Sequence, residues 1–294
     1  MIKKAVIPAA GYGTRLLPIT KVIPKVMIPI LTKPTLQYVV EEAVSAGINE
    51  ILIIIGWKGD VIREYYESHP QEMIDWLQTR NRPDLIQYIK SIIPKDVSIS
   101  FKIQDILDGL AGAILRGRSF LGTDNFVVLL GDNIILEKSV GSLLEEMMKI
   151  HEKYSSAVTL CVAKVPSEDV SKFGIIGFKG HFEEEGRKVY EVTEIREKPP
   201  PEKAPSNLAI VGRYVFTPEI FDYLKKAPMI GMEIDETQAF KAQVLDEKKV
   251  YAFDLGSTKW FDVGKIDGYF KAFVLYVAYT EGIEKVREWL REIL

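Results

Sequence analysis

The chain is organised around the stretch Ala9-Ala10-Gly11-Tyr12-Gly13-Thr14-Arg15, which directly follows a short apolar run at residues 5–8 that is typical of a strand. Its two glycines lack the Cβ atoms that would keep backbone N–H groups away from an anion, and they tolerate unusual dihedral angles. Lys21 and Lys25 add positive charge close to Arg15. The stretch therefore predicts a loop at the end of the first strand that binds a triphosphate.

A simpler interpretation is that the glycines serve only a strand-to-helix turn, as Gly-x-Gly does in many α/β proteins. The stretch also differs from the common nucleotide-binding fingerprints. It lacks the third glycine of the dinucleotide-binding loop and the Gly-Lys-Ser/Thr ending of a P-loop. The first difference argues against a nicotinamide-dependent dehydrogenase, and the loop alone leaves the phosphate site and the plain turn both open.

The composition is that of a soluble globular protein, with 47% apolar and 27% charged residues. A chain of 294 residues is long for an average domain but suits one large α/β domain. The net charge of −3 argues against a dedicated nucleic-acid binder, whose domain is usually basic. We therefore expect small-molecule substrates and no nucleic-acid partner.

Cysteine and histidine usage excludes several kinds of site. Cys161 is the only cysteine, which rules out an internal disulfide, and its apolar surroundings at residues 157–163 predict a core residue. The three histidines are scattered without ligand spacing, so a zinc site or a histidine catalyst is not expected. The apolar runs are only as long as strands, and the N-terminus does not resemble a signal peptide. We expect a cytoplasmic protein without a membrane partner.

The first half of the chain alternates strand and helix patterns. Residues 17–29 contain three prolines and predict an ordered, extended loop. Thr35 is the expected N-cap of a helix that runs to residue 46 and stops at Gly47. A buried-type strand at residues 50–56 follows, and this alternation predicts a parallel βαβ unit.

Further elements of this half follow from periodicity and from proline breaks. Residues 60–91 predict two or three surface helices broken at Pro70 and Pro83. Residues 98–103 alternate as a strand does and lead through a loop into a helix near residue 110. Another buried strand at residues 126–130 ends in Gly131-Asp132-Asn133.

The second half is richer in strands and predicts an antiparallel extension of the same sheet. Strands are expected at residues 157–163, 173–178, 190–197, 209–216 and 250–254, loops at 180–187 and 199–206, and helices at 236–246 and 265–279. We predict one domain over residues 1–280 and a C-terminal amphipathic helix over 281–294. Its apolar face comprises Ile283, Val286, Leu290 and Ile293. That face predicts either packing on the same chain or a homo-oligomer, a dimer or tetramer.

Several polar residues stand where the predicted strands end. Asp132 follows a buried strand, and ligands of parallel sheets bind beyond such ends. Together with Asp262 it would suit Mg²⁺, although each aspartate could instead cap a turn or helix. Glu197 and Lys198 could bind a sugar hydroxyl and a phosphate, or simply form a solvated charge pair. Gln104 could read a base edge.

The combination of these residues resembles a known family. Residues 8–15 with Pro18, Thr20-Lys21 and Pro24-Lys25 look like the signature of the sugar-1-phosphate nucleotidylyltransferases. The likeness is greatest to the members that use UTP and glucose 1-phosphate. It continues through residues 36–43, 194–199, 204–214 and 260–268, so it covers nearly the whole chain in order.

The chain departs from that pattern near the nucleotide. Val26 stands where the UTP-using members usually have glutamate. Residues 108–111 and 130–133 look more like the related thymidylyltransferases. The resemblance therefore leaves UTP and dTTP both open as the donor.

The resemblance implies a Rossmann-like, mostly parallel mixed sheet flanked by helices, with an antiparallel sugar-binding extension. A nucleotide half over about residues 1–150 would be followed by a sugar-phosphate half over about 151–280. The nucleotide would bind Ala10, Gly11, Gly13 and Thr14, with Arg15 on the triphosphate and Gln104 and Gly109 on the base. Lys25 would stabilise the attacked phosphate, and Asp132 and Asp262 would hold Mg²⁺. The sugar phosphate would bind Gly174, Glu197, Lys198 and Tyr214, with Lys198 on its phosphate.

The implied reaction joins UTP and glucose 1-phosphate to give UDP-glucose and pyrophosphate, a step of nucleotide-sugar biosynthesis. A sugar phosphate is already nucleophilic near neutral pH, so positioning and charge neutralisation suffice. The alternatives are dTTP as donor, use of both nucleotides, or a non-catalytic nucleotide-sugar sensor. Retention of Arg15, Lys25, Asp132, Lys198 and Asp262 together argues against the sensor.

Overall fold

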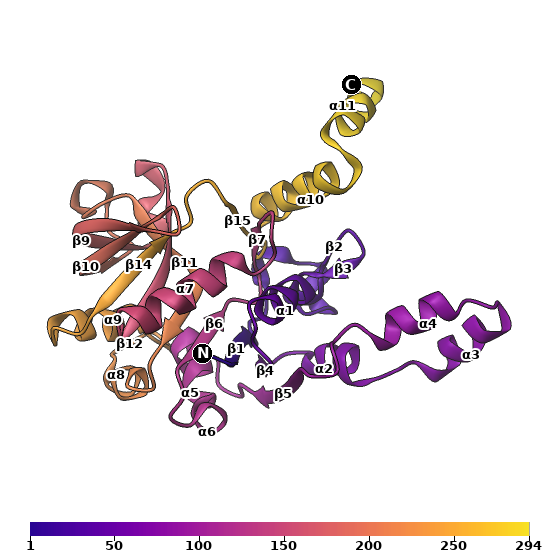
Figure 1. Cartoon of the computed structure of the whole chain (residues 1–294), viewed down its shortest axis with the longest axis horizontal. Helices are drawn as coiled ribbons and strands as arrows, with labels where there is room; N and C mark the ends of the chain where they lie inside the picture. The colour runs from indigo at the N-terminus through magenta and orange to yellow at the C-terminus, as the bar shows by residue number, and fades with distance from the viewer. Residues whose placement is uncertain (294) are drawn as a thin grey trace.

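A mixed nine-stranded sheet forms the centre of the molecule (Figure 1). The computed structural model describes residues 1–293, with side chains up to residue 292. From one edge to the other the strands are β5 (Ser98–Ile103), β4 (Glu50–Ile55), β1 (Lys4–Ala9), β6 (Phe126–Leu129), β11 (Leu208–Phe216), β8 (Val158–Lys164), β14 (Val250–Asp254), β10 (Arg187–Glu197) and β9 (Gly174–Glu184).

The strands of the first half are parallel, as the sequence pattern predicts. β1 pairs with β4 and with β6, and β4 pairs with β5, all in parallel register. Each of these strands except the edge strand β5 is an apolar run buried on both faces. In β1, Ala5 and Ile7 pack into one core and Val6 packs into the other. The parallel ends place the residues after β1, β5 and β6 at one edge of the sheet.

Helices cover both faces of the sheet (Figure 1). Residues of α1, α2 and α7 pack into the first core, and residues of α5, α8 and α9 into the second. The helices are α1 (Thr35–Ser45), α2 (Gly59–Glu67), α3 (Gln71–Thr79), α4 (Pro83–Lys90), α5 (Gly109–Arg116), α6 (Arg118–Leu121), α7 (Ser142–Lys153), α8 (Ile220–Lys226), α9 (Glu236–Leu245), α10 (Ile266–Glu281) and α11 (Ile283–Ile293).

The second half of the chain extends the same sheet. β11 lies between β6 and β8 and is antiparallel to both, so it joins the two halves. β10 pairs antiparallel with β14 and β9 at the far edge. This helix-flanked mixed α/β sheet confirms the predicted fold class.

Short strand pairs and 3-10 turns hold the loops. Two-stranded sheets pair β15 (Lys259–Asp262) with β7 (Asn133–Leu136), β12 (Met229–Ile230) with β13 (Glu233–Ile234), and β2 (Pro29–Ile30) with β3 (Lys33–Pro34). The loop after β1 contains three 3-10 turns, η1 (Thr14–Leu16), η2 (Ile19–Lys21) and η3 (Lys25–Met27). Two more, η4 (Ser167–Lys172) and η5 (Pro201–Lys203), lie in the second half.

Two local predictions were wrong. Thr35 is the first residue of α1 and not its N-cap; its hydroxyl donates to the carbonyl of Ile28 and does not accept a hydrogen bond from a helix N–H. Residues 180–187 form the ends of β9 and β10 and their turn, not a loop. The turn is made by Glu185 and Gly186 at φ of 51° and 76°, the left-handed geometry that closes tight hairpins.

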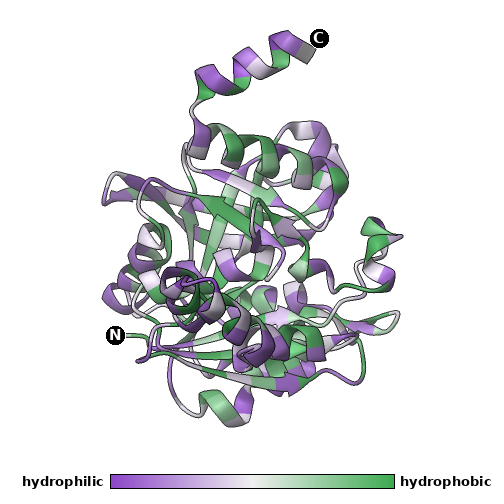
Figure 2. Cartoon of the chain, turned by 90° about the vertical axis from the view of Figure 1, so that its right-hand side faces the viewer, coloured by the Kyte–Doolittle hydropathy of each residue, from purple (hydrophilic) through white to green (hydrophobic). Residues whose placement is uncertain are grey.

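Two helical segments extend from the body. The predicted helices between residues 60 and 91 are confirmed as α2, α3 and α4, of which α3 and α4 form a projecting hairpin (Figure 1). α11 stands clear of the sheet at the C-terminal end (Figure 2) and contacts α10, with Val286 buried. The predicted apolar face also included Ile293, whose side chain lies outside the described residues, as does Leu294. No helix among the described residues is long and apolar enough to cross a membrane.

Candidate active site

The glycine loop is folded back on the segment that carries Lys25. Gly13 has φ of 66°, a left-handed conformation that glycine adopts without strain. A Cβ atom there would lie 2.7 Å from Cβ of Lys25, so the close approach also needs glycine. The hydroxyl of Thr20 donates to the carbonyl oxygen of Gly13 at 2.9 Å and fixes the loop. The Lys25 side chain consequently lies beside the backbone of Gly11.

Lys25 and Asp132 form an ion pair across the end of the sheet. Nζ of Lys25 lies 2.5 Å from Oδ2 of Asp132, which follows β6. Burial opposes ionisation of Asp132, but the Lys25 charge and hydrogen bonds from Lys25 and Asn133 outweigh it and hold the pKa of that carboxyl below its usual value. Asp132 is therefore an anion before any ligand binds.

Asp262 reaches the same place because β15 pairs with β7. Asp262 lies opposite Asn133 in this pair, and the N–H of Val263 donates to the carbonyl of Asp132 at 2.9 Å. A Cβ atom on Gly264 would lie 2.6 Å from Oδ2 of Asp132 and 3.1 Å from Oδ1 of Asp262. The two carboxylates thus converge on a space that the missing side chain leaves free.

This pair of carboxylates fits a Mg²⁺-type cation. Such an ion usually binds one or two carboxylates and takes its other oxygen ligands from water and substrate phosphates. No group of three or more ligand-type side chains occurs among residues 1–293, so those outer ligands would have to come from water and substrate.

One cavity of about 470 Å³ opens over these groups, within the size range of small-molecule sites. It brings together all the residues that the sequence assigned to the nucleotide and the metal. They are Ala10, Gly11, Gly13, Thr14, Arg15, Lys25, Gln104, Gly109, Asp132 and Asp262. The wall near Gln104 is apolar, with Leu107, Leu110 and Ala113.

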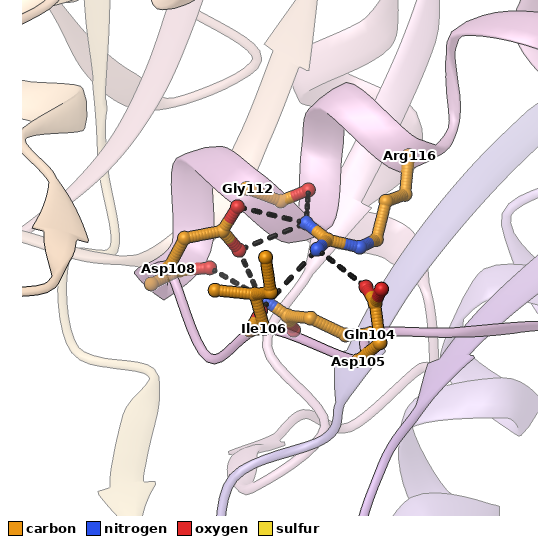
Figure 3. Close-up of polar contacts among 7 residues, drawn as sticks. Gln104, Asp105, Ile106, Asp108, Gly112 and Arg116 are labelled. Carbon is orange, nitrogen blue, oxygen red and sulfur yellow. Dashed lines mark hydrogen bonds and ion pairs between the residues drawn. The ribbon is translucent and has the colours of Figure 1, made fainter.

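A hydrogen-bonded cluster surrounds the side chain of Gln104, which lines the cavity (Figure 3). Gln104 is buried and donates to the carboxylate of Asp108 at 2.8 Å. Arg116 in α5 binds both oxygens of that carboxylate at 2.8 and 2.9 Å and also pairs with Asp105. The segment between β5 and α5 is therefore held by charge-assisted hydrogen bonds.

The residues assigned to the sugar phosphate form a separate group. Glu197 accepts hydrogen bonds from Thr237 and Lys198, both at 2.9 Å. A Cβ atom on Gly174 would lie 3.2 Å from the carboxylate of Glu197, so this glycine adjoins the same group. Lys198 is exposed, with φ of 43°. These residues do not line the cavity, but Glu233 of β13 does, and its charge acts on Lys198.

Tyr214 and Glu236 lie behind this group. The ring of Tyr214 is buried against Phe216 and Phe240, and burial, together with the nearby Glu236 and Glu197, raises the pKa of its hydroxyl far above the usual value. Glu236 begins α9, and burial with the neighbouring acids Glu197, Asp235 and Glu233 raises its pKa to about 7. The sugar-phosphate assignment therefore brings three predicted residues together and leaves the Tyr214 ring within the core.

The sequence analysis missed several residues that shape the site. Glu233 comes from a charged stretch near α9 and carries no motif. Gly264, which leaves room between the aspartates, follows Asp262 closely but has no signature of its own. Arg116 lies eight positions after Asp108, and the i, i+4 periodicity of α5 offers a weak signal that the two could face each other.

A comparison with protein families gives a decisive match. A model described as nucleotidyl transferase matches residues 4–278. The chain belongs to the nucleotidyl transferase family. The match spans the loop, both aspartates and the group around Glu197, so this nucleotidyl transferase has its whole candidate site within the family region.

Individual relatives of this nucleotidyl transferase are similar along most of its length. A protein named UTP–glucose-1-phosphate uridylyltransferase from Bacillus subtilis (strain 168) is 42% identical over 270 residues, 91% of this chain and 88% of the relative. A protein of the same name from Staphylococcus haemolyticus (strain JCSC1435) is 41% identical over 278 residues, 94% of this chain and 92% of the relative. The solved structure of a UTP-bound UGPase from Acinetobacter baumannii has a TM-score of 0.89 at 34% identity and covers 99% of each chain.

Proposed function

We propose that this nucleotidyl transferase transfers the uridylyl group of UTP to glucose 1-phosphate and releases pyrophosphate. The observation that carries the proposal is the cavity in which the glycine loop, Lys25 and the paired aspartates lie together. The full-length similarity to proteins named for this reaction supports it. The described residues contain no histidine or cysteine in this cavity, and the reaction needs neither.

The chemistry is an in-line displacement at the α-phosphorus of UTP. A phosphate oxygen of glucose 1-phosphate forms the new bond, the bond from the α-phosphorus to the bridging oxygen breaks, and pyrophosphate leaves. We assign Arg15 to the triphosphate and Lys25 to the charge that develops on the attacked phosphate. Backbone N–H groups of the glycine loop would orient the phosphates.

The paired carboxylates would hold the metal ion. Asp132 and Asp262 offer hard oxygen ligands on one point, and Mg²⁺ is the ion that this donor set and phosphate substrates favour. When bound, the ion would neutralise phosphate charge and favour departure of pyrophosphate. Lys25 pairs with Asp132 in the structure, which keeps the carboxylate ionised for this role.

We assign the sugar phosphate to the group around Glu197. Lys198 is an exposed cation beside it and would bind the phosphate, while Glu197 would accept hydrogen bonds from sugar hydroxyls. Residues 1–150 would then serve mainly the nucleotide and residues 151–280 mainly the sugar phosphate. Glu233 borders the cavity, and its negative charge contributes to the raised pKa of Lys198. Glu233 therefore links the nucleotide residues to the sugar-phosphate residues.

Pyrophosphate release across a panel of substrates tests the proposal. The purified chain with Mg²⁺ is offered UTP, dTTP, CTP, ATP and GTP, each with glucose 1-phosphate or another hexose 1-phosphate. We expect the highest kcat/KM for UTP with glucose 1-phosphate. A higher value for dTTP would favour the alternative donor, which adds only a base methyl and lacks the 2′-hydroxyl. No release with any pair would overturn the proposal.

A second measurement tests the sugar side. Lys198→Ala should raise the KM for glucose 1-phosphate at least about tenfold with little change in the KM for UTP, because one charge-assisted hydrogen bond is lost. Lys179→Ala serves as a control, since Lys179 is an exposed lysine of the same half that pairs with Glu191. An unchanged KM in Lys198→Ala would reject its role.

A further inference from the structure

The orientation of the Gln104 amide follows from its partners. Its Nε2 lies 2.8 Å from Oδ1 of Asp108 and 3.0 Å from the carbonyl oxygen of Gly109. A carboxylate and a carbonyl can only accept hydrogen bonds, so the amide nitrogen and not its oxygen must face them. Both N–H groups of Gln104 are thereby committed within the protein.

The other end of this amide remains available to a ligand. Among the described residues no donor bonds to Oε1 of Gln104, and this atom is not closed off from solvent. Gln104 lines the cavity next to Leu107 and Leu110. The protein therefore presents a hydrogen-bond acceptor, and no donor from this side chain, to whatever occupies this end of the cavity.

Arg116 holds the carboxylate that fixes this orientation (Figure 3). One guanidinium nitrogen donates to both oxygens of Asp108 and to the carbonyl of Gly112, all within 2.9 Å. The other donates to Asp105 at 2.9 Å and to the carbonyl of Ile106. The side chains of Arg116 and Asp108 are only 17% and 18% exposed, so the pair is poorly screened by water.

A glycine provides the space for this arrangement. The carboxylate of Asp108 lies against Gly112, where an added Cβ atom would be 1.8 Å from Oδ1. Gly112 lies inside α5 with ordinary helical backbone, so alanine would suit the helix itself better than glycine does. Alanine at this position would displace the carboxylate without opposing the helix.

We propose that Arg116 is a positioning residue that, through Asp108, locks Gln104 with its carbonyl oxygen toward the base and so selects bases that carry a ring N–H. Uracil and thymine have this donor at N3, whereas N3 of cytosine is an acceptor and would face Gln104 Oε1 without a proton between them. The inference rests on the proposed function in placing the nucleotide base at Gln104. It concerns the choice between bases that carry an N3–H, such as uracil and thymine, and cytosine, which does not. It makes no statement about the choice between uracil and thymine, which differ by a methyl group.

Equilibrium binding of UTP and CTP tests the inference without any catalytic step. Titration calorimetry with Mg²⁺ gives the Kd values of UTP, dTTP and CTP for the full chain and for two clamp variants, Arg116→Met and Gly112→Ala, which disturb the contact between Arg116 and Asp108. Arg118→Met and Gly180→Ala are the matched controls, because Arg118 is a half-exposed arginine of the next helix and a Cβ on Gly180 would meet no atom within 4 Å. Thermal unfolding checks that every variant is folded.

We expect the parent protein to bind UTP at least about tenfold more tightly than CTP. Uracil gains one well-placed hydrogen bond, whereas with cytosine two acceptors face each other and repel. Both clamp variants should lose affinity for UTP and dTTP in parallel and keep that for CTP, so that the ratio falls to about threefold or less. The controls should keep the parent ratio. Gly112→Ala separates a clamp effect from loss of charge, since it leaves Arg116 in place.

Two outcomes would overturn the inference. One is a parent protein that binds UTP and CTP equally well. The other is a pair of folded clamp variants that keep the parent ratio. Both are distinct from failure of the proposed function, which is judged by pyrophosphate release alone.

Discussion

Among single residues, Lys25 occupies the most central position in the candidate site. Its side chain runs beside Gly11 and Gly13, and its ammonium group pairs with Asp132, so one residue lies between the glycine loop and the proposed metal position. The ion pair with Asp132 holds the ammonium group of Lys25 in place before substrate arrives, so the group need not be reoriented during the reaction. Such a residue should matter more for turnover than for binding.

Lys25→Met should lower kcat by about a hundredfold or more and change the KM for UTP little, because it removes charge stabilisation of the transition state. Initial rates of pyrophosphate release measure both constants. Lys271→Met is the control, since Lys271 is an exposed lysine on α10. A variant with near-normal kcat would contradict the assigned role of Lys25.

Gly264 acts by lacking a side chain. Gly264→Ala would put a methyl group between the carboxylates of Asp132 and Asp262, at 2.6 and 3.1 Å from their oxygens. We expect the affinity for divalent cation to fall about tenfold, in line with other changes next to metal ligands. Mn²⁺ binding followed by electron paramagnetic resonance with UTP present measures this directly. Gly180→Ala should bind Mn²⁺ as the parent does; equal binding by Gly264→Ala would count against a shared metal site.

At the scale of secondary-structure elements, a buried ion pair between Arg213 and Glu42 connects β11, α1 and the segment that follows Asp132. Arg213 of β11 and Glu42 of α1 are 1% and 5% exposed and form two hydrogen bonds at 2.7 and 2.6 Å. Arg213 also donates to the carbonyl of Asn133 at 2.9 Å, next to Asp132. The pair therefore ties helix, central strand and aspartate loop together.

Removing one partner should leave the other charge buried and unpaired. Arg213→Met and Glu42→Gln should each lower the free energy of unfolding by about 3 to 5 kcal/mol. Urea unfolding followed by circular dichroism measures this loss. The double variant Glu42→Gln/Arg213→Met should lose clearly less than both single losses added together, because no unpaired charge remains. Fully additive losses would show that the two side chains do not act as a pair.

Elements were predictable where the sequence pattern reflects burial. The strands at residues 50–55 and 126–129 carry continuous apolar runs at residues 51–55 and 126–129, and each lies inside the sheet with a neighbouring strand on both sides. The hairpin ends of β9 and β10 were missed because polar residues there face solvent, and only pairing with the neighbouring strand makes them extended. The self-association predicted from the tail stays a prediction, which light scattering would test.

The site was predictable to the extent that sheet topology determines it. Parallel strands end at one edge, so the residues after β1, β5 and β6 could be expected together before any coordinates were known. The contribution of Glu233 depends on how β13 attaches to the backbone of Asp108, a contact between segments far apart in sequence. The hydrogen bonds among Gln104, Asp108 and Arg116 likewise depend on side-chain packing, which the helical periodicity of the sequence does not specify.

At the scale of the whole molecule, one buried histidine makes stability depend on pH. His151 of α7 is 1% exposed, and burial lowers its pKa to about 4, with only a small opposing effect from Glu152. The unfolded chain takes up this proton near pH 6.5, whereas the folded chain does so only near pH 4. The stabilising contribution is thus complete above pH 6.5 and is lost as the pH falls toward 4.

His151→Gln should reveal this loss. Between pH 7 and pH 5 the parent should lose about 2 kcal/mol relative to the variant, measured as the change in their difference in unfolding free energy. The comparison must be relative, because Glu236, with a pKa raised to about 7, changes stability in the opposite direction over much of this range. A difference that is the same at both pH values would exclude His151 as the source.

The insertion of β11 between β6 and β8 also determines when the sheet can be completed as the chain is synthesised from its N-terminus. The edge of β6 has no partner until residues 208–216 have been synthesised, long after the glycine loop has left the exit tunnel. Asp262 comes later still, so a nascent chain that has grown past residue 132 carries only Asp132 of the aspartate pair until residue 262 is added. A truncated translation product that lacks β15 would keep the glycine loop and Asp132 but not Asp262, and would therefore lack the paired carboxylates that the proposed metal site requires.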